Sequence, residues 1–507
     1  MTTRPRLLLA AVAVVLTAAS CSDTNDAATT SVSEPQVTAP TTSRATSTTT
    51  TAAPPATADA FAGLVVPEAE ALGIGDDYFP TLGNPGYDVD HYTLDLVFQP
   101  DSITLDGIAT IEATATADLV SINLDFTVLE AVQVQVDGED AEWQSVEEDL
   151  VITPSSTIPA GEAFVIDVTY GGEPKQARSG AVPFGIGWQT VNDQNYVVAE
   201  PDAAHSWFPN NDHPLDKATY TFRLNVPDGT TAAANGTLVE RITDLGREIF
   251  VWEMASPMAS YLATVVIGDF DIVEDEAASA EAGIPIRHVL PVGKTVADYP
   301  GLERTGEMVR FLEEKFGPYP FDTYGIAVVD GFGAALENQT LSLFDSNLAE
   351  SFFFEDVLVH ELAHHWFGNS VSPGAWQDIW LNEGFASYAE WLWIEREASR
   401  EFLEQEIALE RDEFAGAGFP APGEPPVFEL FGPAVYRVGA MTLHALRLTV
   451  GDESFFELLT EHATRFANGA ARTADFIAVA EEVAGLELDA LFDSWLYDRA
   501  VPEFPAG

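Results

Sequence analysis

Residues 357–369 read Val-Leu-Val-His-Glu-Leu-Ala-His-His-Trp-Phe-Gly-Asn. If they form a helix, His360 and His364 lie four residues apart on one face, close enough for both imidazoles to bind one metal ion. Glu361 then lies beside that ion. In this His-Glu-x-x-His pattern the histidines hold zinc and the glutamate serves as the general base toward water. The segment therefore predicts a zinc site with an adjacent base.

A catalytic zinc ion needs a third protein ligand when its fourth position stays open for water or substrate. Glu383 follows His364 after 18 intervening residues and lies in residues 380–384, Trp-Leu-Asn-Glu-Gly. This separation allows one helix to end, a loop to turn back and a second helix to present the glutamate. We therefore expect His360, His364 and Glu383 to bind one Zn²⁺ per chain, with Glu361 as the catalytic base.

Residues 1–20 have the pattern of an export signal: two arginines, an apolar run too short to span a bilayer, and small residues before Cys21. Cys21 is the only cysteine, which excludes an intramolecular disulfide. Its position resembles the lipobox of bacterial lipoproteins, although Ala18 replaces the usual leucine. We expect a cell-surface lipoprotein anchored through Cys21. The alternative is an ordinary signal peptide and a secreted protein.

Composition separates a stalk from the folded part of the chain. Residues 21–75 begin at the lipid-attachment cysteine and are rich in Thr, Ala, Ser and Pro, which cannot build a packed core. The whole chain has 81 acidic and 22 basic residues and a net charge of -59. Such a surface repels nucleic acid and anionic lipid, so we expect no nucleic-acid partner and membrane contact only through Cys21.

Residues 76–272 carry the signals of strands and turns. Residues 91–98 and residues 108–115 alternate polar and apolar side chains, as half-buried strands do. Turn sequences such as Asp137-Gly138 and Gly171-Gly172 separate the apolar segments. The pattern predicts an antiparallel, largely β domain.

Residues 273–503 change to helical periodicity. Two short apolar segments, residues 324–329 and 341–344, indicate buried strands. The fold class is therefore α+β and multidomain, with a β domain followed by an α-rich domain that holds a small sheet. Helices are predicted over residues 302–316, 355–369, 376–397, 400–414, 434–450, 453–467, 473–484 and 488–496.

The segments 360–369 and 380–384 together resemble the M1 zinc aminopeptidases of the gluzincin group. The resemblance extends over roughly residues 85–500 and implies a saddle-like N-terminal β domain packed on a thermolysin-like catalytic domain. Many members of that family continue into a long helical carboxy-terminal domain that covers the active site. This chain resembles a short form without it, so we expect a more open cleft or a cover supplied by another subunit.

Residues 334–338, Ala-Ala-Leu-Glu-Asn, resemble the family's Gly-x-Met-Glu-Asn exopeptidase motif. The glutamate of that motif binds the free α-ammonium of the substrate. The resemblance assigns this role to Glu337 and places Ala334, Ala335 and Asn338 beside the substrate. A carboxylate fixed one residue's length from the metal selects peptides that begin there. Ala334 departs from the family's glycine.

Two more segments extend the resemblance. Residues 199–201, Ala-Glu-Pro, look like the family segment through which the β domain reaches the active site, so Glu200 is implied as a second ligand for the α-ammonium. Residues 436–440, Tyr-Arg-Val-Gly-Ala, resemble the family's Tyr-x-Lys-Gly-Ala. The resemblance implies that Tyr436 donates a hydrogen bond to the developing oxyanion. Val438 stands where the family has lysine.

The resemblance implies a zinc-dependent aminopeptidase that acts on peptides with a free amino terminus. Two alternatives stay open. A zinc endopeptidase of the same group is compatible with Ala334, and a tethered peptide-binding module with an inert site belongs to a different functional class. The sequence does not disclose the preferred amino-terminal residue, the physiological substrate or the oligomeric state.

Overall fold

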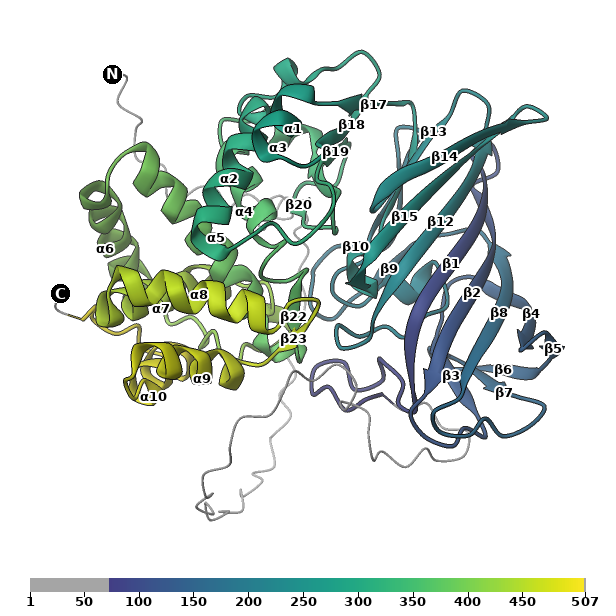
Figure 1. Cartoon of the computed structure of the whole chain (residues 1–507), viewed down its shortest axis with the longest axis horizontal. Helices are drawn as coiled ribbons and strands as arrows, with labels where there is room; N and C mark the ends of the chain where they lie inside the picture. Colours follow the sequence, from purple (N-terminus) through teal and green to yellow (C-terminus); the bar gives the residue numbers. More distant parts are fainter. Residues whose placement is uncertain (1–72, 506–507) are drawn as a thin grey trace, which may run out of the picture.

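The computed structural model describes residues 73–505. The predicted export signal, Cys21 and nearly all of the predicted stalk lie outside the described residues. A β-rich domain, drawn in purple to teal, lies beside a mainly helical domain, drawn in teal to yellow (Figure 1). Within residues 73–505, no helix combines the length and the apolar character that crossing a membrane requires. The expectation of an α+β, multidomain fold, with a β domain followed by an α-rich domain, is confirmed.

An eight-stranded sheet dominates the first domain. In β1 the side chains of Tyr92, Leu94 and Leu96 are buried while those between them are partly exposed, so one face of the sheet packs on the core. The sheet is antiparallel apart from one pair, β1 and β12, which run parallel. Its strands in spatial order are β14 (Thr237–Asp244), β15 (Arg247–Ala259), β12 (Lys217–Pro227), β1 (Tyr87–Gln99), β2 (Thr104–Ala115), β8 (Ala163–Gly172), β4 (Glu130–Val136) and β5 (Glu139–Asp140).

Two smaller sheets complete this domain. In the five-stranded sheet, β11 ends two residues before Glu200, and four of its five residues are buried. The three-stranded sheet contains β3 (Ile122–Asp125), β7 (Asp149–Thr153) and β6 (Glu142–Val146). The five-stranded sheet contains β13 (Thr231–Ala234), β16 (Val265–Gly268), β11 (Gln194–Val198), β10 (Gly185–Val191) and β9 (Gln176–Arg178).

The second domain holds the small sheet that the sequence predicts. The segments 324–329 and 341–344 correspond to β19 and β21, which pair in parallel. The predicted domain boundary after residue 272 falls within β17, and the chain changes sheets between β16 and β17. β20 forms one edge of the sheet, whose order is β17 (Phe270–Glu274), β18 (Arg287–Pro291), β19 (Ile326–Val329), β21 (Ser342–Asp345) and β20 (Ala335–Leu336).

Ten α-helices lie within residues 73–505, and most match the predicted periodicity. Two short ones, α1 and α3, were not predicted. The predicted helix 488–496 is a short α-helix followed by a π-helical turn at Asp493–Tyr497. The helices are α1 (Glu276–Ala282), α2 (Thr305–Phe316), α3 (Ser346–Ala349), α4 (Phe354–Ala363), α5 (Trp380–Glu397), α6 (Arg400–Ala417), α7 (Pro433–Val450), α8 (Asp452–Arg465), α9 (Thr473–Ala484) and α10 (Asp489–Phe492).

The predicted helix 355–369 is too long, because α4 ends at Ala363 and His364 is its C-cap. Beyond it, the N–H groups of residues 369–371 bond to the carbonyls five residues earlier, which makes a wide turn. Gly368 allows this turn with its φ of +129°, a conformation that favours glycine. A short parallel pair, β22 (Val371–Pro373) and β23 (Gly469–Ala471), follows the turn.

The β domain holds the turn after α4 from the other side. Lys217 on β12 is half-buried, and its ammonium donates to the carbonyls of Asn369 and Ser370 at 2.7 and 3.0 Å. The Tyr261 hydroxyl donates to the Gly368 carbonyl at 3.1 Å. These bonds satisfy backbone acceptors that a buried turn would otherwise leave unpaired. The interface between the domains therefore fixes the chain just after the helix that carries the histidines.

Candidate active site

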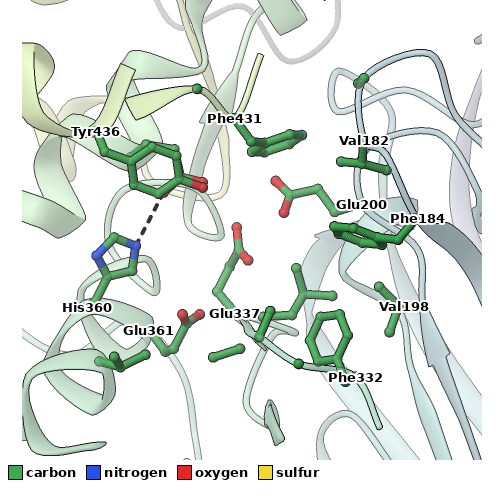
Figure 2. A pocket seen from close by; sticks show the side chains of 18 of the residues that line it. Val182, Phe184, Val198, Glu200, Phe332, Glu337, His360, Glu361, Phe431 and Tyr436 are labelled. Carbon is green, nitrogen blue, oxygen red and sulfur yellow. Dashed lines mark hydrogen bonds and ion pairs between the residues drawn. The ribbon is translucent and has the colours of Figure 1, made fainter. Parts of the chain in front are cut away.

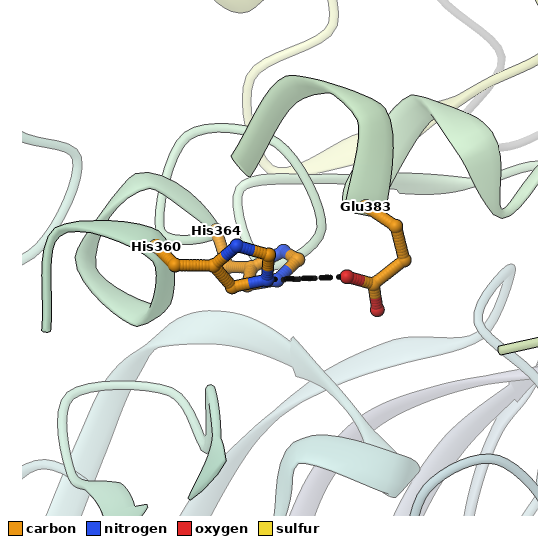
Figure 3. Close-up of side chains that lie close together, drawn as sticks. All are labelled: His360, His364 and Glu383. Atoms are coloured by element: carbon orange, nitrogen blue, oxygen red, sulfur yellow. Dashed lines mark hydrogen bonds and ion pairs between the residues drawn. The ribbon is translucent and has the colours of Figure 1, made fainter. Parts of the chain in front are cut away.

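His360, His364 and Glu383 converge on one point. His360 on α4 and His364 at its C-cap present their rings from one helix face, while Glu383 approaches from the first turn of α5 (Figure 3). The Nε2 atoms of the two imidazoles lie 3.2 and 3.5 Å from the same Oε2 of Glu383. All three side chains are buried, and one ligand atom from each lies within 4.8 Å of the others. The three residues could therefore hold one metal ion.

The opposite nitrogen of each imidazole is bound by the protein. Nδ1 of His360 donates to Oε1 of Glu390 at 2.7 Å, and Nδ1 of His364 donates to the carbonyl of Phe367 at 3.2 Å. A carboxylate and a carbonyl can only accept, so these bonds place the proton on Nδ1 and leave the Nε2 lone pair for a metal. The rings are thus oriented as ligands.

Glu390 is a site residue that the sequence reasoning missed. It lies two helical turns after Glu383 on α5, so both carboxylates lie on the same helix face. Its second oxygen accepts from Arg437 at 3.3 Å, and Arg437 also binds Glu410 of α6 through two bonds. All three charged groups are buried. The sequence does carry a signal for it, since Glu390 lies two helical turns after Glu383 on the same helix face. Burying a second carboxylate there costs free energy unless a partner binds it.

Glu361 lies beside the histidines and lines the cavity in Figure 2. Its carboxylate, that of Glu337 and the ring of His364 offer ligand atoms within 4.8 Å of one another. Burial raises the pKa of Glu361 to about 8, against the lowering influence of His360 and His364. A buried carboxylate with a raised pKa is suited to accept and return a proton.

Tyr436 closes the cavity above His360. Its ring stacks on that of His360 with centroids 5.9 Å apart and planes at 16°. Burial and neighbouring carboxylates, first that of Glu383, raise the pKa of Tyr436 well above its ordinary value. The phenol therefore keeps its proton and remains a hydrogen-bond donor.

A glycine pair places Tyr436 next to the ligands. A side-chain carbon on Gly384 of α5 would lie 3.0 Å from the backbone of Gly439 on α7, which is tighter than most packed contacts. The absence of side chains at both glycines therefore allows the two helices to pack backbone against backbone at this point. Gly384 follows Glu383 directly and Gly439 lies one turn after Tyr436, so this contact sets the distance between ligand and phenol.

Glu337 and Glu200 approach from opposite domains. Glu337 directly follows edge strand β20, and Glu200 follows β11 of the β domain; Figure 2 shows both carboxylates in the middle of the cavity. Both are buried, and in the described part of the chain Oε1 of neither carboxylate has a hydrogen-bond partner. Burial, followed by the proximity of Glu337, raises the pKa of Glu200 well above its ordinary value. Two such carboxylates call for a cation between them.

The other predicted substrate-binding residues of segment 334–338 differ in whether they line the cavity. Ala334 and Ala335 line the cavity. Ala334 has a negative φ, and the positive φ falls on Gly333, so the backbone accommodates alanine here. Asn338 does not line the cavity. Its amide donates to the carbonyl of Leu262 at 3.1 Å, which holds the segment against the β domain.

The donor set suits zinc. Two imidazoles and one carboxylate, with a glutamate beside them, are the ligand types and the arrangement of a catalytic zinc site that leaves one position open. Although burial alone would raise it, His364 and His360 hold the pKa of Glu383 at about 2, so this ligand is ionised. The described residues thus combine a β domain, a helical domain and a metal-binding cluster with the donor types of a zinc metallopeptidase.

Comparison with known proteins places the chain within that class. Residues 301–495 match the Peptidase family M1 domain, and residues 88–262 match the Peptidase M1 N-terminal domain. The chain belongs to peptidase family M1. Similar solved structures include an M1 zinc metallopeptidase from Deinococcus radiodurans, which is 30% identical with a TM-score of 0.79 and matches over 86% of this chain and 99% of that one.

Curated relatives are longer. Aminopeptidase M1-A of Oryza sativa subsp. japonica is 30% identical over 451 residues, which are 81% of this chain and 50% of the relative. Leucyl aminopeptidase of Saccharolobus solfataricus is 25% identical over 442 residues, 82% of this chain and 54% of the relative. The chain therefore spans about half the length of the curated relatives it matches, whereas it spans nearly all of the Deinococcus structure.

Proposed function

We propose that this protein is a zinc-dependent aminopeptidase that removes residues from the free amino terminus of peptides. The observation that carries the proposal is the pair of buried carboxylates, Glu200 and Glu337, in the cavity that also contains the metal-binding cluster. A peptide's α-ammonium supplies the missing hydrogen bonds and the missing charge. The relatives named above are aminopeptidases, which supports the same conclusion.

His360, His364 and Glu383 are the residues that would hold the zinc ion. When bound there, the ion supplies Lewis acidity toward a water molecule and toward the scissile carbonyl. Glu361 accepts a proton from the attacking water and delivers it to the leaving amine. Tyr436 donates a hydrogen bond to the carbonyl oxygen as negative charge develops on it.

Glu200 and Glu337 set the register of the peptide. With the α-ammonium between them, the first carbonyl of the peptide lies one residue's length away, near Tyr436 and the ligand cluster. A peptide bond further along the chain cannot occupy that position while the ammonium is bound. An endopeptidase of the same group would gain nothing from two buried carboxylates at this point, and an inert peptide-binding module would need neither Glu361 nor Tyr436.

The proposal is tested by turnover of a panel of amino-acid anilides with and without a chelator. We expect hydrolysis that disappears when the metal is removed and returns when Zn²⁺ is added. Hydrolysis that survives complete removal of the metal, or a metal-loaded protein that cleaves no anilide in the panel, would contradict the proposal.

We also propose that the protein is exported and anchored to a membrane by a lipid on Cys21. Support comes from the sequence: an apolar run and small residues precede the single cysteine, and a Thr-, Ala-, Ser- and Pro-rich segment follows it. Labelled palmitate should enter the wild-type protein and be absent from Cys21→Ala. A wild-type protein that takes up no label and is released into the medium would instead indicate secretion.

A further inference from the structure

The cavity has a charged half and an apolar half. The metal-binding cluster, Glu361 and Tyr436 occupy the charged half, with Glu200 and Glu337 at its border (Figure 2). The cavity measures about 480 Å³. Beyond the border, the labelled side chains are apolar: Val182, Phe184, Val198 and Phe332, while Phe431 lies at the border between Tyr436 and Val182.

We propose that the apolar half binds the side chain of the substrate's amino-terminal residue and selects large apolar and aromatic residues over small and acidic ones. This inference rests on the function proposed above. It adds the class of amino terminus that the enzyme accepts.

The order of atoms in a peptide determines which half receives the side chain. The α-carbon is bonded to the α-ammonium and to the first carbonyl carbon. With the ammonium at Glu200 and Glu337 and the carbonyl near Tyr436, the α-carbon lies at the border between the two halves. Its side chain cannot enter the charged half, which the ligands and Glu361 occupy. It therefore extends toward Phe184 and Phe332.

Both domains build the apolar half. Val182 and Phe184 precede β10 and Val198 ends β11, whereas Phe332 lies before β20 and Phe431 lies before α7. Across the rim, a side chain added to Gly180 of the β domain would touch Val427 of the catalytic domain. The two segments thus approach closely enough to enclose a substituent from both sides. Burying a large apolar side chain there removes more apolar surface from water than burying a methyl group.

Charge excludes acidic amino termini. Among the described residues that line the cavity there is no lysine or arginine, whereas six are glutamates. Glu429 is the one glutamate outside the cluster around the ligands and the ammonium position. Its Oε2 fills the space that a side-chain carbon on Gly432, the N-cap of α7, would occupy, and the helix dipole there favours a carboxylate. An aspartyl or glutamyl side chain in the apolar half would meet apolar side chains and the negative charge of Glu200 and Glu429.

The test is the metal-loaded enzyme acting on anilides of Phe, Leu, Ala, Arg and Glu. We expect kcat/KM for Phe and Leu to exceed that for Ala by about 10- to 200-fold, the range that apolar pockets achieve. The Glu anilide should fall at least about 100-fold below Phe because of like-charge repulsion. Equal rates across the panel would overturn the inference. So would a preference for Arg, which would point to Glu429 as the side chain's partner.

The Phe184→Ala variant tests whether Phe184 forms a wall of the apolar half. Phe184 is 38% exposed at the rim, so its loss need not disturb the core. We expect kcat/KM for the Phe anilide to fall about 10-fold while that for the Ala anilide stays unchanged. Phe402→Ala is the matched control: Phe402 is 43% exposed on α6 and does not line the cavity. An equal loss for both anilides in Phe184→Ala, or the same selective loss in Phe402→Ala, would overturn the inference.

These outcomes are separate from failure of the proposed function. A chelator-sensitive enzyme with no preference among anilides remains an aminopeptidase, and only the inference about the apolar half then fails. A metal-loaded protein that cleaves no anilide contradicts the proposed function itself.

Discussion

The two halves of the cavity are built in different ways. The charged half, which contains the metal-binding cluster, comes mainly from one segment of the catalytic domain. Residues 360–383 contain both histidines, Glu361 and Glu383. The apolar half, which is proposed to receive the side chain of the amino-terminal residue, is assembled from segments of both domains, with Glu200 and Glu337 at its border. In the proposed function, the chemistry therefore depends on a local segment of the sequence, whereas the choice of substrate depends on how the two domains pack.

The strongest test of the charged half is a substitution of the proposed base, Glu361. Glu361→Gln keeps the size of the side chain but cannot accept a proton, so we expect kcat to fall by about 10³- to 10⁴-fold. Zinc content, measured on the purified variant, should stay at one ion per chain, because Glu361 is not among the three converging ligand atoms. Parental turnover in this variant would show that another group is the base.

Tyr436 tests the same half through a different contact. Tyr436→Phe retains the ring that stacks on His360 and removes only the hydroxyl. We expect kcat to fall by about 10²- to 10³-fold with little change in KM, since the lost bond forms mainly in the transition state. Tyr497→Phe, in which an exposed tyrosine loses its hydroxyl, serves as the control and should keep the parental kcat.

Glu390 tests whether orientation of the ligands matters. Glu390→Ala removes the acceptor for Nδ1 of His360, and we expect zinc affinity to fall by about 10- to 100-fold in a competition titration with a chelator. Glu390→Gln keeps an acceptor and should lose less. Glu397→Ala, an exposed change on the same helix, is the control. Unchanged zinc affinity in Glu390→Ala would mean that the ligand cluster alone orients the ring.

Asp76 tests the packing of the two domains. Its carboxylate accepts from His213 of the β domain at 3.3 Å and from the Trp376 N–H of the catalytic domain at 3.0 Å. Burial would raise its pKa, but these bonds outweigh burial and lower it from 3.8 to about 2. A folded-state pKa below the unfolded one stabilises the folded protein above pH 3.8, and that stabilisation is lost as the pH falls toward 2.

The lowered pKa of Asp76 corresponds to about 2 kcal/mol at neutral pH. We expect Asp76→Asn to be less stable than the parent by about this amount in urea unfolding at pH 7, with the difference shrinking between pH 4 and 2. Asp77→Asn, an exposed neighbour, is the control. A difference between Asp76→Asn and parent that does not change with pH would contradict this account of the interface.

Sequence reasoning succeeded where the determinants are local. The spacing of His360, His364 and Glu383 is enough to predict convergence, because two helices and a short loop leave few other arrangements. The alternation in residues 91–98 predicted a strand that is present as part of β1. The class of fold followed from the change of period between the two halves of the chain.

It failed where the determinants are distant in sequence. Residues 364–367 contain no helix-breaking residue, yet helix α4 ends before them. The turn that follows is bound by Lys217 of the β domain. The hydrogen bond from the Asn338 amide to the Leu262 carbonyl of the β domain was also not predicted. Contacts of this kind depend on domain packing, which no local period encodes. The apolar half of the cavity escaped prediction for the same reason.

The central claim is that the enzyme measures from a free amino terminus, and one comparison tests it most directly. A peptide and its amino-acetylated copy are incubated with the zinc-loaded enzyme, and cleavage of the first bond is followed by mass spectrometry. Acetylation removes the charge that Glu200 and Glu337 would bind, so we expect the free peptide to be cleaved and the blocked copy to remain intact. Cleavage of both at similar rates would contradict the claim and indicate an endopeptidase.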